Sequence, residues 1–244
     1  MRASSEDADS KTIRSVERAI DVLACFDRRT PQLSVTELQK QLGLSRPTLY
    51  RILATLEGKG LIRSFGEPQR FSLGYGASRL AGNWLGQDDF VRAARPILRR
   101  LWEETGETVA LFVAGGNGEK ICVEEMTSRQ ALTFTRGVGF TEKLNVGASG
   151  KAMLAFVPGA PDTAELADVR RTGVSVSEGE IIEGAVSVAA PVFGIENEVA
   201  GGVCVFGPQV RLVGSARADC IARVRAAAAE ISRALGYRPA AAAE

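Results

Sequence analysis

The chain has 244 residues, of which 45% are hydrophobic, and a formal net charge of +1 at pH 7. This length allows one large domain or a small domain beside a medium one, and the composition excludes a disordered or fibrous protein. No stretch holds the roughly 18 to 20 apolar residues that span a bilayer, and residues 1–11 lack the apolar run of a signal peptide. We therefore expect a cytoplasmic protein with no membrane partner.

The chain contains no histidine. This excludes Ser-His-Asp and Cys-His catalysis, histidine general bases and histidine metal sites. The cysteines, Cys25, Cys122, Cys204 and Cys220, are widely separated and include no CxxC pair, so the usual disulfide and zinc-ligand spacings are missing. We expect buried, reduced thiols, no metal, no cofactor and no enzymatic activity.

The charge is divided unevenly. Residues 10–75 hold 11 Lys and Arg against 6 Asp and Glu, a balance of +5, whereas residues 76–244 hold 18 against 20, a balance of −2. A basic excess in the first segment favours a small domain that contacts a polyanion, although charged residues more often form a solvated face.

Three helices are predicted in the first segment, after disordered residues 1–11. Val16, Ile20 and Leu23 define the apolar side of the first and are expected to complete a three-helix core. Ser34 and Glu37 form a capping box that begins the second. Its apolar residues are Val35, Leu38 and Leu42.

A tight turn then leads into the third helix. Gly43 can adopt the left-handed conformation that ends the second helix, Ser45 can cap the third, and Pro47 is tolerated in its first turn. One side of the third helix is apolar and carries Leu49, Ile52, Leu53 and Leu56. The other side is narrow, polar and partly basic, with Pro47, Tyr50, Arg51, Ala54 and Thr55.

Two alternating strands follow, residues 61–65 and 69–73, around a turn at residues 66–68. Two helices alone could be a hairpin that only packs in a core, but the basic strand pair makes a winged helix-turn-helix over residues 12–75 the better interpretation. Tyr50 and Arg51 would reach bases or phosphates in a major groove, while Arg63 and Arg70 on the wing would contact the DNA backbone.

The pattern changes after Tyr75. Residues 76–88 are predicted as a linker helix, residues 89–238 as a larger domain, and residues 239–244 as a flexible tail. Two hairpins are expected in the larger domain, centred on residues 115–118 and 194–200, and together with the helices they imply an antiparallel sheet. The predicted fold class is therefore α+β. Helices are expected at residues 90–105, 149–156, 162–172 and 213–235.

The segment from Ser149 to Ala152, SGKA, is similar to a phosphate loop and to a nucleophile elbow. Asn145 replaces the first glycine of the phosphate loop, and no histidine is present to activate Ser149, so neither nucleotide hydrolysis nor acyl transfer is expected. GASG can instead begin a helix whose free amides bind a carboxylate. The acidic pairs Glu124 with Glu125 and Glu178 with Glu180 are interpreted as solvated surface.

Five runs together carry a family resemblance: SVERAIDVLACF, LSVTELQKQLGLSRPTLYRILATLEGKGLI, RFSLGYGASRLA, LNVGASGKAMLAF and EGAVSVAAPVFG. They resemble the IclR family of bacterial transcriptional regulators, over residues 13–236. The resemblance implies a winged helix-turn-helix, a linker helix and a GAF-like effector-binding domain. It also implies a double-stranded DNA operator as partner, a small-molecule effector, dimers through the DNA-binding part and commonly tetramers. The DNA-binding residues expected are Ser45, Arg46, Pro47, Thr48, Tyr50, Arg51, Arg63 and Arg70.

The resemblance implies an effector site as well. The backbone amides of Ala148 and Ser149 would face the effector, as would the side chains at Ser177, Ser187, Cys204 and Phe206. Phe206 stands where glyoxylate-binding members have a serine, which favours a larger, partly apolar or aromatic acid over a small polar one.

An alternative function is a cysteine-based redox sensor or enzyme that acts through Cys122 or Cys204. A reactive thiol needs an electropositive setting, and neither cysteine has a basic neighbour adjacent in the sequence. Thiol labelling of the native protein discriminates between the two functions.

Overall fold

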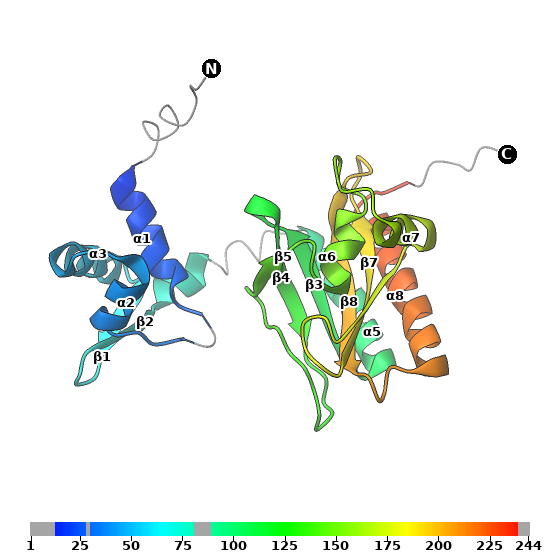
Figure 1. Ribbon diagram of the computed structural model, residues 1–244, viewed down its shortest axis with the longest axis horizontal. Helices are drawn as coiled ribbons and strands as arrows, with labels where there is room; N and C mark the ends of the chain where they lie inside the picture. The colour runs from blue at the N-terminus through cyan, green and yellow to red at the C-terminus, as the bar shows by residue number, and fades with distance from the viewer. Residues whose placement is uncertain (1–12, 28–29, 81–88, 239–244) are drawn as a thin grey trace, which may run out of the picture. The chain divides into compact units, whose positions relative to one another are not determined.

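The computed structural model describes residues 13–27, 30–80 and 89–238. The chain divides into two compact units, residues 1–87 and 88–244, which are described separately (Figure 1). None of the helices in the described ranges has the length and apolar content that a membrane crossing requires.

The N-terminal unit contains three helices and a hairpin. α1 (Arg14–Ala24), α2 (Val35–Leu42) and α3 (Arg46–Gly58) precede the antiparallel strands β1 (Ile62–Phe65) and β2 (Arg70–Leu73). A bridge between Leu33 and Phe71 fastens the hairpin to the segment before α2. The winged helix-turn-helix prediction is therefore confirmed. Its core is formed by Val22, Phe26, Leu33, Val35, Leu38, Leu49, Leu53, Leu56, Ile62 and Phe71.

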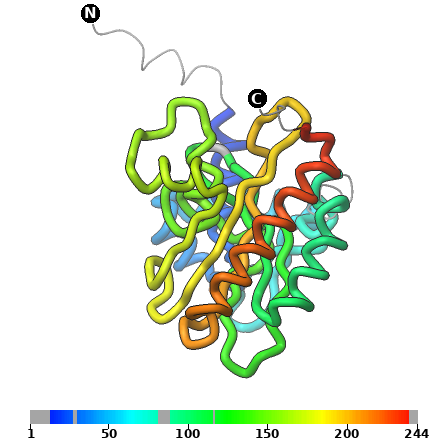
Figure 2. Tube along the Cα trace, turned by 90° about the vertical axis from the view of Figure 1, so that its right-hand side faces the viewer, coloured from blue at the N-terminus to red at the C-terminus, as the bar shows by residue number. Residues whose placement is uncertain are grey.

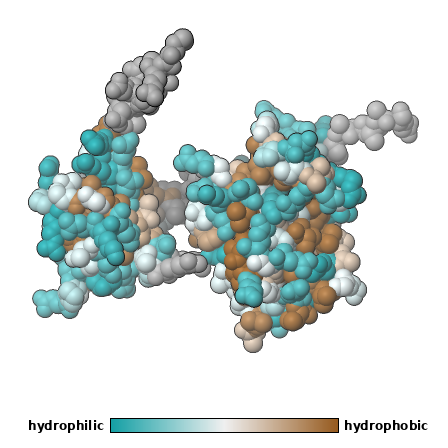
Figure 3. Space-filling model, in the orientation of Figure 1, coloured by the Kyte–Doolittle hydropathy of each residue, from teal (hydrophilic) through white to brown (hydrophobic). Residues whose placement is uncertain are grey.

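α1 is present, but it does not pack through the side that the sequence predicted. Val22 is fully buried, whereas the exposed fractions of Val16 and Ile20 are 51% and 58%. The prediction that Val16 and Ile20 enter the core is wrong, because α1 meets the other helices through Val22 and partly through Leu23. With Ile13, the two residues form an exposed apolar stripe, and brown patches lie among the teal atoms over α1 (Figure 3).

Residues 75–80 are helical, which agrees with the first part of the expected linker helix. The remainder of that prediction, residues 81–88, lies outside the described residues, as do the predicted disordered segment 1–11 and the tail 239–244.

The C-terminal unit is built on one antiparallel sheet with the strand order β5-β4-β3-β8-β7-β6. Both predicted hairpins are present, as β3 with β4 and β7 with β8. The two outer strands β5 and β6 were missed, because they are short and polar. The strands are β3 (Thr108–Ala114), β4 (Glu119–Met126), β5 (Thr141–Lys143), β6 (Ser175–Glu178), β7 (Ala185–Phe193) and β8 (Val199–Pro208).

Helices cover both faces of this sheet. α5 (Asp89–Thr105) and α8 (Gly214–Ala234) lie side by side over one face, where valines from four strands meet them (Figure 2). α6 (Gly147–Leu154) packs on the opposite face, with α7 (Ala164–Thr172) beside it. The sequence placed all four helices correctly, except that α6 begins at Gly147 rather than Ser149. The α+β fold class is confirmed.

A β-bulge interrupts β4. Leu111 pairs with Glu124 and Phe112 pairs with Cys122, so Val123 is the extra residue. Since side chains alternate along a strand, this extra residue turns Glu124 and Met126 toward α5 instead of α6.

Candidate functional site

The corner between α2 and α3 is fixed by local hydrogen bonds. The Ser34 hydroxyl accepts from the Glu37 amide, and the Ser34 amide donates to the Glu37 carboxylate at 2.7 Å, which completes the predicted capping box. Gly43 has φ 65°, a left-handed conformation that ends α2. Ser45 occupies the N-cap position of α3, but its hydroxyl bonds to the Thr48 hydroxyl at 2.9 Å rather than to a backbone amide.

The outer side of α3 is solvent-exposed, as predicted. Leu49 and Leu53 are buried, whereas Tyr50 is 48% exposed. Arg51 on the same outer side is also exposed. Arg46 at the start of the helix donates to the Thr36 hydroxyl of α2 at 3.3 Å. The helix therefore presents a polar and partly basic ridge to solvent. The remaining exposed residues of this ridge are Ser45, Pro47, Ala54 and Thr55.

The two wing arginines differ. Arg63 is exposed on β1 and donates to the Ser72 hydroxyl across the hairpin at 3.0 Å. Arg70 turns back into its own unit, where it donates to the Gln32 carbonyl at 2.9 Å and pairs with Glu37 at 3.2 Å. The guanidinium of Arg70 therefore fastens the wing to the capping box of α2, and Arg63 is the arginine that faces outward.

In the C-terminal unit, strand register brings three predicted effector residues into one row. Ser177 pairs with Ser187, and Ser187 pairs with Phe206, across β6, β7 and β8. They line a cavity of about 10 Å³ on the face of the sheet that carries α6. This is room for roughly one water molecule. The other lining residues are Phe134, Arg136, Gly179, Glu180, Ile181, Ile182 and Ala185.

The other three predicted effector residues are buried outside this cavity. Cys204, Ala148 and Ser149 are 3%, 1% and 5% exposed, and none of them lines this cavity. Ala148 and Ser149 belong to the first turn of α6, and within the described residues neither amide donates a hydrogen bond. Such amides, at the positive end of the helix dipole, are suited to an anion.

The start of α6 is in contact with the segment that follows β6. Gly147 has φ 71°, and a Cβ built there would lie 2.5 Å from Cδ1 of Ile181. Glycine is therefore required at this position for two reasons, its backbone conformation and the close approach of Ile181. Residues 179–184, which include Ile181, cover the first turn of α6.

Glu180 places a carboxylate beside the same turn. It accepts from the Lys151 ammonium at 2.9 Å and from the Ser177 hydroxyl at 3.0 Å. Burial raises the pKa of Glu180, but hydrogen bonds from Lys151, the Gly147 amide and Ser177 outweigh it, so that its pKa lies below 4.5. The protein therefore keeps an ionised carboxylate of its own at the N-terminus of α6.

Two cations near this pocket were not predicted. Lys120 is 1% exposed, pairs with Glu142 at 3.1 Å and donates to the carbonyl of Val146, just before α6. Arg136 lines the cavity with its guanidinium 5.0 Å from the centre of the Phe140 ring, and the described residues supply no carboxylate to it. The only signal in the sequence was their basic character.

The acidic pairs differ in exposure: Glu124 and Glu125 are half-buried, whereas Glu178 and Glu180 are exposed, as the sequence indicated. Glu124 pairs with Arg95 at 2.9 Å, and Glu178 pairs with Arg217 at 2.6 Å. Glu125 accepts from the amides of Arg136 and Gly137, both at 2.8 Å. Each carboxylate therefore has a structural partner, which sequence neighbours could not reveal.

Neither candidate reactive cysteine has an exposed thiol. Cys122 is 0% exposed, and Cys204 is 3% exposed. Burial raises the pKa of Cys204 to about 12, although Lys120 and Arg136 act in the opposite direction. A thiol in this state is a poor nucleophile at neutral pH. No cluster of three or more metal-ligating side chains occurs in the described parts of the chain.

A winged helix-turn-helix with an exposed, partly basic ridge, joined in sequence to an antiparallel sheet domain, is typical of DNA-binding transcriptional regulators. Comparison with known proteins agrees. Residues 15–64 match the IclR helix-turn-helix domain, and residues 83–162 and 163–233 match the bacterial transcriptional regulator IclR C-terminal domain. The chain belongs to the IclR family of transcriptional regulators.

Individual relatives extend over most of the chain. It is 28% identical over 227 residues to the HTH-type transcriptional regulator BhcR of Paracoccus denitrificans, covering 84% of this chain and 81% of BhcR. It is 25% identical to the transcriptional repressor IclR of Escherichia coli, covering 92% and 90%. The crystal structure of an IclR-type regulator from Silicibacter sp. matches with TM-score 0.79 and 26% identity, covering 92% and 97%. These relatives are regulators of transcription, and the match of residues 15–64 to the family's helix-turn-helix domain makes DNA the partner of the N-terminal unit.

Proposed function

We propose that the protein is a ligand-responsive regulator whose operator affinity is switched by a small organic acid with a partly apolar or aromatic body. The observation that supports this most directly is the position of Glu180, whose carboxylate rests on Lys151 and beside the Gly147 amide. A site that binds a carboxylate of its own chain has the hydrogen-bond donors and the positive potential for a carboxylate of a ligand.

The pocket has suitable groups for the rest of such a ligand. Its carboxylate would bind at the amides of Ala148 and Ser149, and its polar substituents would bond to Ser177 and Ser187. The apolar body would lie on Phe206, near Cys204, and leave water there. Arg136 offers a second cation at the cavity wall, which favours an acid over a neutral molecule.

The small volume of the cavity supports a model in which ligand binding switches the conformation of the C-terminal unit. Its volume of about 10 Å³ is far below the roughly 300 Å³ of an ordinary ligand pocket. A ligand must therefore displace residues 179–184, with Glu180 and Ile181, before it reaches α6. A ligand changes an equilibrium only by binding two conformations with different affinity, and this displacement supplies the two conformations.

DNA would be bound by the ridge of α3 and by Arg63 on the wing. Arg70 would support DNA binding only by holding the wing in place, since its guanidinium is bonded to Gln32 and Glu37. We propose a dimer as the binding species, because one helix covers only a few base pairs and the exposed stripe of Ile13, Val16 and Ile20 on α1 offers an apolar contact surface.

The test is calorimetry of the full chain against aromatic and aliphatic acids, with operator binding measured in parallel for each acid. Phe206→Ser should shift preference toward smaller and more polar acids. The control is Ile195→Ser, in the turn between β7 and β8 at the other end of the hairpin, where the side chain is 74% exposed. If no acid binds, or if Phe206→Ser leaves the ranking of acids unchanged, the assignment of the effector site to this pocket is wrong.

A further inference from the structure

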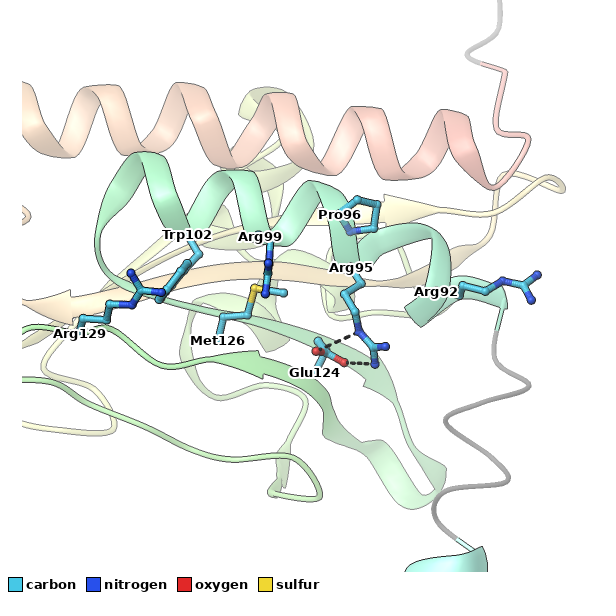
Figure 4. Close-up of a pocket in the computed structure, with 8 residues that line it drawn as sticks. All are labelled: Arg92, Arg95, Pro96, Arg99, Trp102, Glu124, Met126 and Arg129. Carbon is cyan, nitrogen blue, oxygen red and sulfur yellow. Dashed lines mark hydrogen bonds and ion pairs between the residues drawn. The ribbon is translucent and has the colours of Figure 1, made fainter.

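A second and larger hollow lies on the other face of the sheet. A groove of about 530 Å³ runs between α5 and β4, and it shares no residue with the cavity around Phe206. Figure 4 shows its side chains in a row, from Arg92 at one end to Trp102 and Arg129 at the other. The lining residues are Arg92, Arg95, Pro96, Arg99, Trp102, Glu124, Met126 and Arg129.

The groove is strongly cationic, with four arginines against one glutamate. Arg92 pairs with Asp89, and Arg95 pairs with Glu124 at 2.9 Å. Arg99 and Arg129 have no ion pair with any described residue. Positive charge that its own unit does not neutralise indicates an anionic partner.

The apolar floor of the groove is formed by Trp102 and Met126, and hydrogen bonding fixes the Trp102 ring. Trp102 donates its indole N–H to the Thr127 carbonyl at 3.0 Å, and the Arg129 guanidinium lies 4.3 Å from the Trp102 ring centre. Met126 reaches the groove because the bulge at Val123 turns it toward α5. Trp, Arg and Met are the residue types enriched at the centres of protein interfaces.

The spacing of the arginines fits an extended chain. Arg95 and Arg99 are four residues apart on α5, which is about 6 Å along the helix axis. Side chains on the same side of an extended segment repeat about every 6.7 Å. Carboxylates at alternate positions of such a segment can therefore meet successive arginines.

We propose that this groove binds an extended acidic segment of a partner protein. Carboxylates at alternate positions meet Arg95, which also holds Glu124, and Arg99. An apolar side chain farther along on the same side lies on Trp102 and Met126, and a carboxylate beyond it meets Arg129. The charge and the linear arrangement favour this occupant over a compact small acid, which would use one end of the groove only. The proposal does not depend on the effector pocket.

The experiment uses the full chain and two fluorescein-labelled heptapeptides of equal composition, followed by fluorescence anisotropy at low ionic strength. The first, Glu-Ser-Glu-Ser-Leu-Ser-Glu, places acids and leucine on one side when extended. The second, Ser-Glu-Glu-Ser-Ser-Leu-Glu, does not. We expect the first to bind at least about tenfold more tightly, since one additional charge-assisted pair is worth about a factor of ten.

Two groove variants and one control locate the binding. Arg99→Glu and Arg129→Glu should each raise the Kd of the first peptide about tenfold or more. Arg225→Glu makes the same charge change at an exposed position of α8 and should leave the Kd unchanged. Circular dichroism confirms that each variant is folded. Equal binding of the two peptides, no binding of either, or an equal loss in Arg225→Glu would overturn the proposal.

Two further outcomes would assign the groove to another occupant and also overturn it. One is a change of oligomeric mass in Arg99→Glu, measured by sedimentation, which would identify a second copy of this chain. The other is a loss of affinity for double-stranded DNA in Arg99→Glu as large as the loss for the peptide, which would identify nucleic acid.

Discussion

The proposed DNA-binding ridge on α3 and the proposed effector pocket differ in how far they are already formed. On α3, Tyr50 and Arg51 already project into solvent, and the helix is fixed by the capping box and by Gly43. The proposed pocket has a volume of only about 10 Å³, and Ile181 and Glu180 lie against Gly147 in the first turn of α6. On this proposal the α3 ridge would bind DNA without remodelling, whereas the pocket would have to widen before it could hold a ligand.

The largest effect is expected from the exposed stripe of α1. Ile20→Asp should prevent the proposed dimer and raise the Kd for a two-half-site operator on the order of 10²-fold, since linked binding events gain that much. Operator binding and sedimentation measure the two consequences. Ser15→Asp adds the same charge to another side of α1 and is the control. A monomer that retains full operator affinity would contradict the dimer.

A smaller effect is expected on the ridge itself. Arg51→Ala and Tyr50→Ala should each weaken operator binding by about 1 to 3 kcal/mol, the value of a base-edge contact, without loss of folding. Lys59→Ala, at the C-cap of α3, is the control. Unchanged operator affinity in folded Arg51→Ala protein would show that the ridge does not contact DNA.

Glu180→Gln should make the proposed pocket easier to open, because it weakens the contacts of Glu180 with Lys151 and Ser177. Because the variant lacks the competing charge at Lys151, we expect acids to bind several-fold more tightly while operator affinity without ligand stays within a factor of two or so. Calorimetry and anisotropy give the two numbers. Weaker acid binding would mean that Glu180 helps to hold the ligand instead of competing with it.

The same substitution has a pH signature. The pKa of Glu180 is lowered in the folded protein, so its stabilising contribution is present above 4.5 and is lost as pH falls through the lowered value. The difference in unfolding free energy between the wild type and Glu180→Gln should be constant from neutral pH down to about pH 6 and then shrink in acid. Urea unfolding across this range is the measurement, and a difference that grows in acid has the wrong sign.

The smallest effect separates the two wing arginines. Arg63→Ala should reduce the salt dependence of DNA binding by about one unit of slope, as expected for one phosphate contact. Arg70→Ala should leave the slope nearly unchanged and instead lower the melting temperature, because Arg70 bonds to Gln32 and Glu37. Equal slopes for both variants would refute this distinction.

The helix-turn-helix was predictable because its signals are local. Ser34 and Glu37 are three residues apart, and Gly43 acts on its own neighbours, so no distant contact is needed. The failure at Val16 and Ile20 has the opposite cause, since an apolar stripe can face another chain as well as a core, and periodicity alone does not distinguish the two.

The pocket was only partly predictable. The family resemblance named Ser177, Ser187 and Phe206, and the strand register places them in one row. Glu180 was judged with its neighbour Glu178, although its partners are Lys151 and Ser177. Arg136 and Lys120 enter through a loop and a strand far from α6 in the sequence, and nothing local marks them as part of the same site.

The extra residue at Val123 couples the two faces of the sheet through the register of β4 against β3. It directs Glu124 to Arg95 in the groove, while Glu125 on the opposite side accepts from the amides of Arg136 and Gly137 at the pocket. A one-residue shift of β4 past β3 that removed the bulge while keeping Val123 would exchange the two carboxylates between the faces. The groove and the pocket therefore depend on the same register of β4 against β3, and a shift of that register would change both surfaces together.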